Sequence, residues 1–130
     1  MSDFASAMRF SGADGYIRAA LTGLASRQRA IANNVANVDT PNFKASEVRF
    51  EDALRDALTR QRASRDHEPA LNALVSRPSL VDGTTTRADG NNVDIEREME
   101  LLGEAQLTYS ALTQLMSTRL SILRSVVGGR

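Results

Sequence analysis

The chain has 130 residues, a length that suits one domain and leaves little room for two. Its 16 Lys and Arg balance its 16 Asp and Glu. A formal net charge of zero argues against a nucleic-acid or anionic-membrane binder, because such a protein relies on clustered positive charge. With no cysteine and a single histidine, the chain offers no disulfide framework and no multi-histidine metal site.

The first predicted element is an amphipathic helix over residues 15–38. Its apolar residues recur in alternating steps of four and three, which places them on one helical stripe. Asp14 can cap the start of this helix. Pro41 disfavours a helical conformation at Thr40, so we expect the helix to end between residues 37 and 39. The apolar members of the stripe are Ile17, Leu21, Leu24, Ile31, Val35 and Val38.

The middle of the chain carries weaker signals. Apolar residues at positions 50, 53, 54, 57 and 58 favour a short amphipathic helix, which completes a turn-and-helix segment over residues 39–58. Residues 59–92 hold two prolines and two Asp-Gly pairs, so we interpret them as a loop with one weak hairpin around Asp82-Gly83. A loop of this length is unusual inside a compact domain. It makes more sense as a surface ordered by partners or as a disordered insert.

The strongest signal predicts a long C-terminal helix over residues 93–127. Two adjacent apolar rows form a band wider than a two-stranded seam, so this helix should contact more than one neighbour. It would be roughly 50 Å long, which is more than a globule of this size needs. The apolar members of the first row are Ile95, Met99, Leu102, Tyr109, Met116, Leu120, Leu123 and Val127, and those of the second are Leu101, Ala105, Leu112, Leu115, Ile122 and Val126.

No pattern in the sequence favours catalysis. His67 stands in a polar stretch without a second positioned group, so a solvated surface histidine is the better interpretation than a general base. The acidic residues from Asp89 to Glu100 partly resemble a calcium loop, but Val93 and Asp94 occupy positions that need a ligand and a glycine. We therefore expect no enzyme activity, no catalytic residues, no cofactor and no metal site. No apolar run is long enough to cross a membrane, and the N-terminal residues show no cleavable signal.

Two motifs carry a resemblance to a known family. The segment Ala36-Asn37-Val38-Asp39-Thr40-Pro41-Asn42-Phe43 resembles the N-terminal signature, ANxxTPGY, of the bacterial flagellar axial proteins of the rod, hook and hook-associated structures. The segment from Asn91 to Met99 resembles the C-terminal signature that opens the last helix of that family. The short centre of the chain is most similar to the proximal-rod members. Asn42 replaces the usual glycine, which predicts a positive φ there, and Phe43 replaces a tyrosine and lacks its hydroxyl.

The resemblance implies an all-α fold in which long N- and C-terminal helices pair as an antiparallel, coiled-coil-like unit within one axial-protein domain, residues 1–130. We expect neighbouring subunits to complete the burial, so that folding is coupled to assembly. The expected intramolecular seam is Ile17, Leu21, Leu24, Ile31 and Val35 against Met99, Leu102, Tyr109, Met116 and Leu123. The expected subunit interface is Leu101, Leu112, Leu115 and Ile122. The expected contact turn is Asn37, Asp39, Thr40, Pro41, Asn42 and Phe43.

The function implied by the resemblance is a structural subunit of the flagellar basal-body rod, in the drive-shaft tube that transmits torque and forms part of the export channel. Its implied partners are other rod subunits, copies of itself, a rod-to-ring adaptor and membrane ring components, with no nucleic acid and no membrane insertion. Its implied location is the periplasmic part of the basal body, reached through the flagellar type III apparatus. Two alternatives stay open: another rod subunit of the family, or a cytosolic coiled-coil adaptor.

Overall fold

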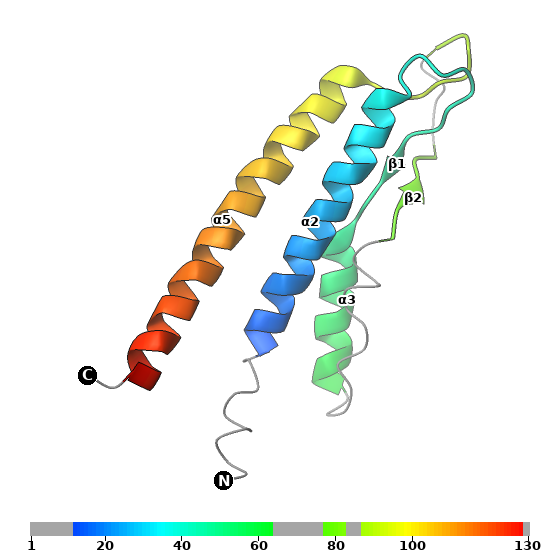
Figure 1. The fold of residues 1–130 in the computed structure, drawn as a ribbon. Coiled ribbons are helices and arrows are strands. Elements are labelled where there is room, and N and C mark those ends of the chain that lie inside the picture. The colour runs from blue at the N-terminus through cyan, green and yellow to red at the C-terminus, as the bar shows by residue number, and fades with distance from the viewer. Residues whose placement is uncertain (1–11, 64–76, 83–86, 129–130) are drawn as a thin grey trace.

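The computed structural model describes residues 12–63, 77–82 and 87–128. In chain order the elements are α2 (Gly12–Ala36), β1 (Ser46–Glu47), α3 (Phe50–Ala63), β2 (Ser79–Leu80) and α5 (Ile95–Gly128). The long helices α2 and α5 run antiparallel, and α3 lies on the other side of α2 from α5 (Figure 1). The predicted all-α class is confirmed, because the long N- and C-terminal helices pack together and the only sheet in the described part has two short strands.

The helix bounds differ from the sequence predictions in informative ways. Helix α2 begins at Gly12, so Asp14 lies inside its first turn and does not cap it. Instead, Asp14 is buried, and its Oδ1 lies 2.9 Å from Nε of Arg119 on α5. Helix α3 continues to Ala63, into the segment that we expected to be a loop. Thr59 and Arg60 in its added turn are polar and exposed, which fits a helical face as well as a loop.

Strand β2 also corrects the predicted hairpin. It ends at Leu80, before Asp82-Gly83, and pairs antiparallel with β1, with Ser46 opposite Leu80 and Glu47 opposite Ser79. The pairing therefore joins two segments that are far apart in the sequence, which local turn signals could not predict. Residues 64–76 and 83–86, with His67 among them, lie outside the described residues.

The core lies where α2 meets α3 and α5. Leu24 of α2 is 1% exposed and shares one apolar cluster with Val48 and Phe50. Gly23 permits this contact, because a Cβ at that position would stand 2.4 Å from the Cβ of Phe50. Arg27 completes the packing with its guanidinium 4.5 Å from the centre of the Phe50 ring. The small residues of the cluster, which let the helices approach one another, are Ala19, Ala20, Ala30 and Ala105.

The face of α5 that packs against α2 lies between the two predicted rows, because its buried and half-buried residues come from both of them. Met99, Tyr109 and Leu123 are 54%, 40% and 46% exposed, so their placement in the intramolecular seam was wrong. Leu101 and Leu112 of the second row are instead half-buried, and Leu112 packs against the core cluster. Of the remaining seam residues, Ile17, Leu24 and Ile31 are buried, and Leu21, Val35, Leu102 and Met116 are half-buried. Their pairing across the seam stays a prediction.

The rotation of α5 is set by features that the apolar periodicity does not contain. Its two rows are equally apolar, so spacing alone cannot select the inner one. Ala105, which is 1% exposed, belongs to the same apolar cluster as Leu24 of α2. Polar contacts then fix both ends, since Glu98 accepts a hydrogen bond from α2 at one end and Arg119 pairs with Asp14 at the other.

Much apolar surface on α5 stays uncovered within the chain. It includes most of the first row and the distal part of the second row: Ile95, Met99, Tyr109, Leu115, Leu120, Ile122, Leu123, Val126 and Val127. A contiguous exposed apolar surface of this kind marks an interaction face in soluble proteins. None of the helices in the described part of the chain is long and apolar enough to cross a membrane.

Candidate functional site

The two signature segments come together at one end of the helix pair. The chain leaving α2 and the chain leading into α5 run side by side there, although more than forty residues separate them in the sequence (Figure 1). We call this region, residues 34–46 with residues 87–98, the signature junction. Asparagine side chains make most of its long-range hydrogen bonds.

Asn91 caps the exit of α2. Its side chain is fully buried, and its Nδ2 donates to the carbonyl oxygens of Asn37 at 2.9 Å, Val38 at 3.0 Å and Thr40 at 2.9 Å. Two N–H protons serve these three acceptors, so at least one proton is shared. Its Oδ1 accepts from the Val93 amide at 2.8 Å. Asn91 thus satisfies the carbonyls of the turn that follows α2, whereas carbonyls in the last turn of the helix itself accept from the Asn37 and Val38 amides.

Asn42 and Gly90 form the closest contact of the junction. Asn42 has a φ of 60°, which confirms the prediction made from its replacement of glycine. Gly90 has a φ of 82°, and a Cβ there would lie 2.5 Å from the Asn42 Oδ1. The Asn42 amide donates to the Asp89 carbonyl at 2.9 Å, and Lys44 Nζ reaches the Gly90 carbonyl at 2.6 Å. A side chain at position 90 would therefore separate the two segments.

Asn92 ties the junction to the small sheet. Its Oδ1 accepts from the Ala45 amide at 2.6 Å, and its Nδ2 donates to the Val81 carbonyl at 3.2 Å. The Val81 amide in turn donates to the Ala45 carbonyl at 2.9 Å. The backbone groups at the end of the β1–β2 ladder are therefore paired through one asparagine.

Asn34 and Glu98 join α2, α5 and β1 at one point. Asn34 is 1% exposed and forms a two-way bond with the Ser46 backbone, accepting from its amide at 2.9 Å and donating to its carbonyl at 2.8 Å. Its Nδ2 also donates to Glu98 Oε1 at 3.1 Å. Burial raises the pKa of the Glu98 carboxyl above its ordinary value, and the hydrogen bond from Asn34 opposes that rise. Glu98 Oε2 has no hydrogen-bond partner in the part of the chain that the structure describes.

The predicted contact turn forms the outer rim of the junction. Asp39, Thr40, Pro41 and Asn42 are exposed, whereas Asn37 and Phe43 are half-buried. Arg87 braces the rim, donating to the Val38 carbonyl at 3.0 Å and lying 3.7 Å from Asp39 and 3.6 Å from Asp89. The turn is thus a rigid, exposed loop, and its contact with neighbouring proteins stays a prediction.

The chemistry of the junction is that of a structural clamp. Apart from the Glu98 carboxyl, its buried polar side chains are the amides of Asn34 and Asn91, which bond chiefly to backbone groups, and Asp94 caps α5 by accepting from the Glu96 and Arg97 amides. Within the described ranges, no group of three or more His, Cys, Asp or Glu side chains could hold a metal ion. Sequence reasoning found both segments but missed Asn34, Asn91 and Glu98 as their contacts. The paired asparagines at 33–34 and 91–92 were the signal, since buried asparagines suit such backbone-capping roles.

Comparison with known proteins agrees with this geometry. The sequence model for the family described as flagella basal body rod protein matches residues 18–44, which cover most of α2 and the contact turn. The chain is similar to the flagellar basal body rod protein FlgB of Bacillus subtilis, at 33% identity over 92% of this chain and 96% of the relative. It is 39% identical to FlgB of Borrelia hermsii, over 80% and 87% of the two chains. For FlgB of Salmonella typhimurium the identity is 28%, over 93% and 96%.

Two paired terminal helices, a clamp built from both signatures and this family match define the class of protein, a structural subunit of the flagellar basal-body rod. The relatives match this chain over nearly their whole length, and both are FlgB proteins, a narrower group than rod proteins in general. The chain belongs to the FlgB family of flagellar basal body rod proteins.

Proposed function

We propose that this rod subunit assembles through the exposed apolar rows of α5, and that the contact turn makes a second set of contacts with its neighbours. The observation that carries the proposal is the uncovered surface of α5, where Tyr109, Ile122 and Leu123 are each at least 40% exposed. Each large apolar side chain that becomes buried contributes roughly 1.5–3 kcal/mol. These side chains are exposed in the free chain, so this stabilisation is gained only when neighbouring subunits bury them.

The proposal reverses the roles that sequence spacing gave to the two rows. Met99 and Leu123 of the first row become part of the subunit interface because their side chains remain exposed within the chain. The distal second row, with Leu115 and Ile122, keeps the interface role. Leu101 and Leu112 leave it, because they already pack within the chain.

The finer assignment follows from family membership together with this surface. The subunit occupies the proximal rod in the periplasmic part of the basal body, after export by the flagellar type III apparatus. It packs there against copies of itself, other rod subunits, and components of the rod-to-ring adaptor and membrane ring. The resulting tube transmits torque and lines part of the export path, with no catalytic step. As a single axial-protein domain, the chain would take its place in the tube as one body.

A pair of matched variants tests this proposal in a strain that lacks its own copy of the gene. Ile122→Asp places a charge in the exposed apolar surface, whereas Ser121→Asp places the same charge on the polar side of α5, beside Thr118 and Ser125. We expect Ile122→Asp to abolish incorporation into isolated basal bodies and motility, because a buried unpaired charge is strongly unfavourable. Ser121→Asp should incorporate. Equal incorporation of both variants would contradict the assignment of the interface.

A further inference from the structure

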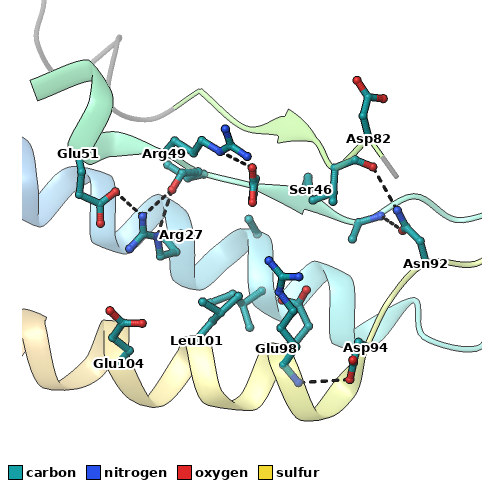
Figure 2. Close-up of a pocket in the computed structure, with 17 residues that line it drawn as sticks. Arg27, Ser46, Arg49, Glu51, Asp82, Asn92, Asp94, Glu98, Leu101 and Glu104 are labelled. Atoms are coloured by element: carbon teal, nitrogen blue, oxygen red, sulfur yellow. Dashed lines mark hydrogen bonds and ion pairs between the residues drawn. The ribbon is translucent and has the colours of Figure 1, made fainter. Parts of the chain in front are cut away.

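A groove runs between α2, α5 and β1. Its volume is about 500 Å³, which is large enough for two or three side chains of a partner. Figure 2 shows its residues, with Leu101 between Glu98 and Glu104 on α5, Arg27 on α2 and Ser46 on β1. Six carboxylates and three arginines line the groove, so its net charge is negative.

Two of the three arginines of the groove are engaged with other groups. Arg27 donates to the Val48 carbonyl at 2.9 Å and pairs with Glu51, and Arg49 pairs with Glu47 (Figure 2). Arg97 attracts Glu98 electrostatically, but the described residues show no hydrogen bond between the two side chains. Glu98 and Glu104 lie six residues apart on α5, and both line the groove.

Glu98 supplies an observation that is independent of the net charge. It is 7% exposed, it lines the groove, and its Oε2 finds no partner among the described residues. A buried carboxylate oxygen without a hydrogen-bond donor is costly, and a positively charged donor is the group that offsets this cost best. Figure 2 shows Glu98 reaching from α5 toward β1, across the floor of the groove.

The apolar part of the lining fits the stem of a basic side chain. Ile31 and Ala30 of α2 and Leu101 of α5 border the same space. Lysine and arginine bury their methylene stems on such surfaces while their charged heads reach polar groups. A small inorganic cation would gain nothing from these contacts, and it prefers several oxygen ligands together.

We propose that this groove, which we call the acidic groove, binds a Lys or Arg side chain from a neighbouring protein of the rod assembly, with the cationic head paired to Glu98 and Glu104. The inference rests on the proposed function only in taking the occupant from a neighbouring protein. It adds a polar contact on the side of the helix pair where β1 lies, separate from the apolar surface of α5.

The test uses the full chain with three short probes, Ac-Gly-Ser-Arg-Ser-Gly-NH₂, its Lys counterpart and its Gln counterpart. Amide chemical shifts are followed while each peptide is added in the millimolar range. We expect the Arg and Lys peptides to shift the amides of Leu101, Ser46 and Ile31, and the Gln peptide to leave them in place. Glu98→Gln and Glu104→Gln should each weaken binding roughly 10-fold, since each removes one charge-assisted hydrogen bond.

Glu100→Gln is the matched control, because Glu100 lies on the same helix, is exposed and does not line the groove. It should bind the basic peptides as the parent chain does. Groove shifts that are equal for all three peptides, or unchanged binding by Glu104→Gln, would overturn the proposal. Self-association of the chain that covers Leu101 without peptide would also overturn it, because a second copy would then be the occupant.

The outcomes separate this inference from the proposed function. If the basic peptides fail to bind while the parent chain still incorporates into basal bodies, the acidic groove is refuted and the rod assignment stands. If the peptides bind but Ile122→Asp incorporates normally, the groove stands and the α5 interface is refuted.

Discussion

The strongest single prediction concerns Asn91, the buried cap of α2. Asn91→Ala removes the donor that serves the carbonyls of Asn37, Val38 and Thr40, together with the acceptor for the Val93 amide. A net hydrogen bond contributes about 1 kcal/mol, and a buried group left without a partner costs about 1–3 kcal/mol. Water can reach the exposed Thr40, and Arg87 still bonds Val38, so part of the loss is recovered. We expect the free energy of unfolding to fall by roughly 3 kcal/mol.

Urea unfolding followed by far-UV circular dichroism measures this loss, and hydrogen exchange at the Thr40 amide localises it. Thr40 donates its amide proton to the Asn37 carbonyl, so its protection should fall when the turn loosens. Asn33→Ala is the control, because Asn33 is exposed and its side chain bonds only to the Asn37 side chain among the described residues. If Asn91→Ala unfolded at the same urea concentration as the parent chain, the junction would not be a clamp.

Two further predictions use the same junction. Burial raises the pKa of Glu98 in the folded state. The contribution of this carboxyl to the free energy of unfolding is therefore largest below its unfolded pKa, and it declines as pH rises through its folded pKa. Glu98→Gln should therefore unfold at a higher urea concentration than the parent at about pH 8, and the difference should shrink toward about pH 4; a constant difference would contradict the burial of the charge. Gly90→Ala should cost about 1–2 kcal/mol because of its positive φ and the nearby Asn42 side chain. Gly103→Ala, in a helix with open space around it, should instead stabilise by roughly 0.5–1 kcal/mol, and a loss at both glycines would refute the local argument.

The helices could be predicted from the sequence because the signals for them are local. The four-three spacing of apolar residues and the position of Pro41 placed the end of α2 within a few residues of Ala36. The positive φ of Asn42 was also predictable, since asparagine tolerates that conformation better than other residues with a Cβ. These features depend on neighbouring residues only.

The features that escaped prediction depend on contacts between distant segments. The partner of β2 is β1, and the cap of α2 comes from Asn91, more than fifty residues away. The rotation of α5 is decided by Ala105 and by the Asp14–Arg119 pair, whereas the apolar spacing permits either row to face inward. In a subunit that packs on several sides, apolar residues that serve neighbours look the same as residues that serve the chain's own core.

Photo-crosslinking in assembled basal bodies tests the central claim most directly. A photoreactive amino acid is placed in turn at Leu123, on the exposed apolar surface of α5, and at Leu24, in the core of the chain. The account predicts crosslinks to other rod proteins or to a second copy from position 123, and none from position 24. Crosslinks confined to α2 of the same chain from position 123 would show that this row is the intramolecular seam, and they would contradict the account.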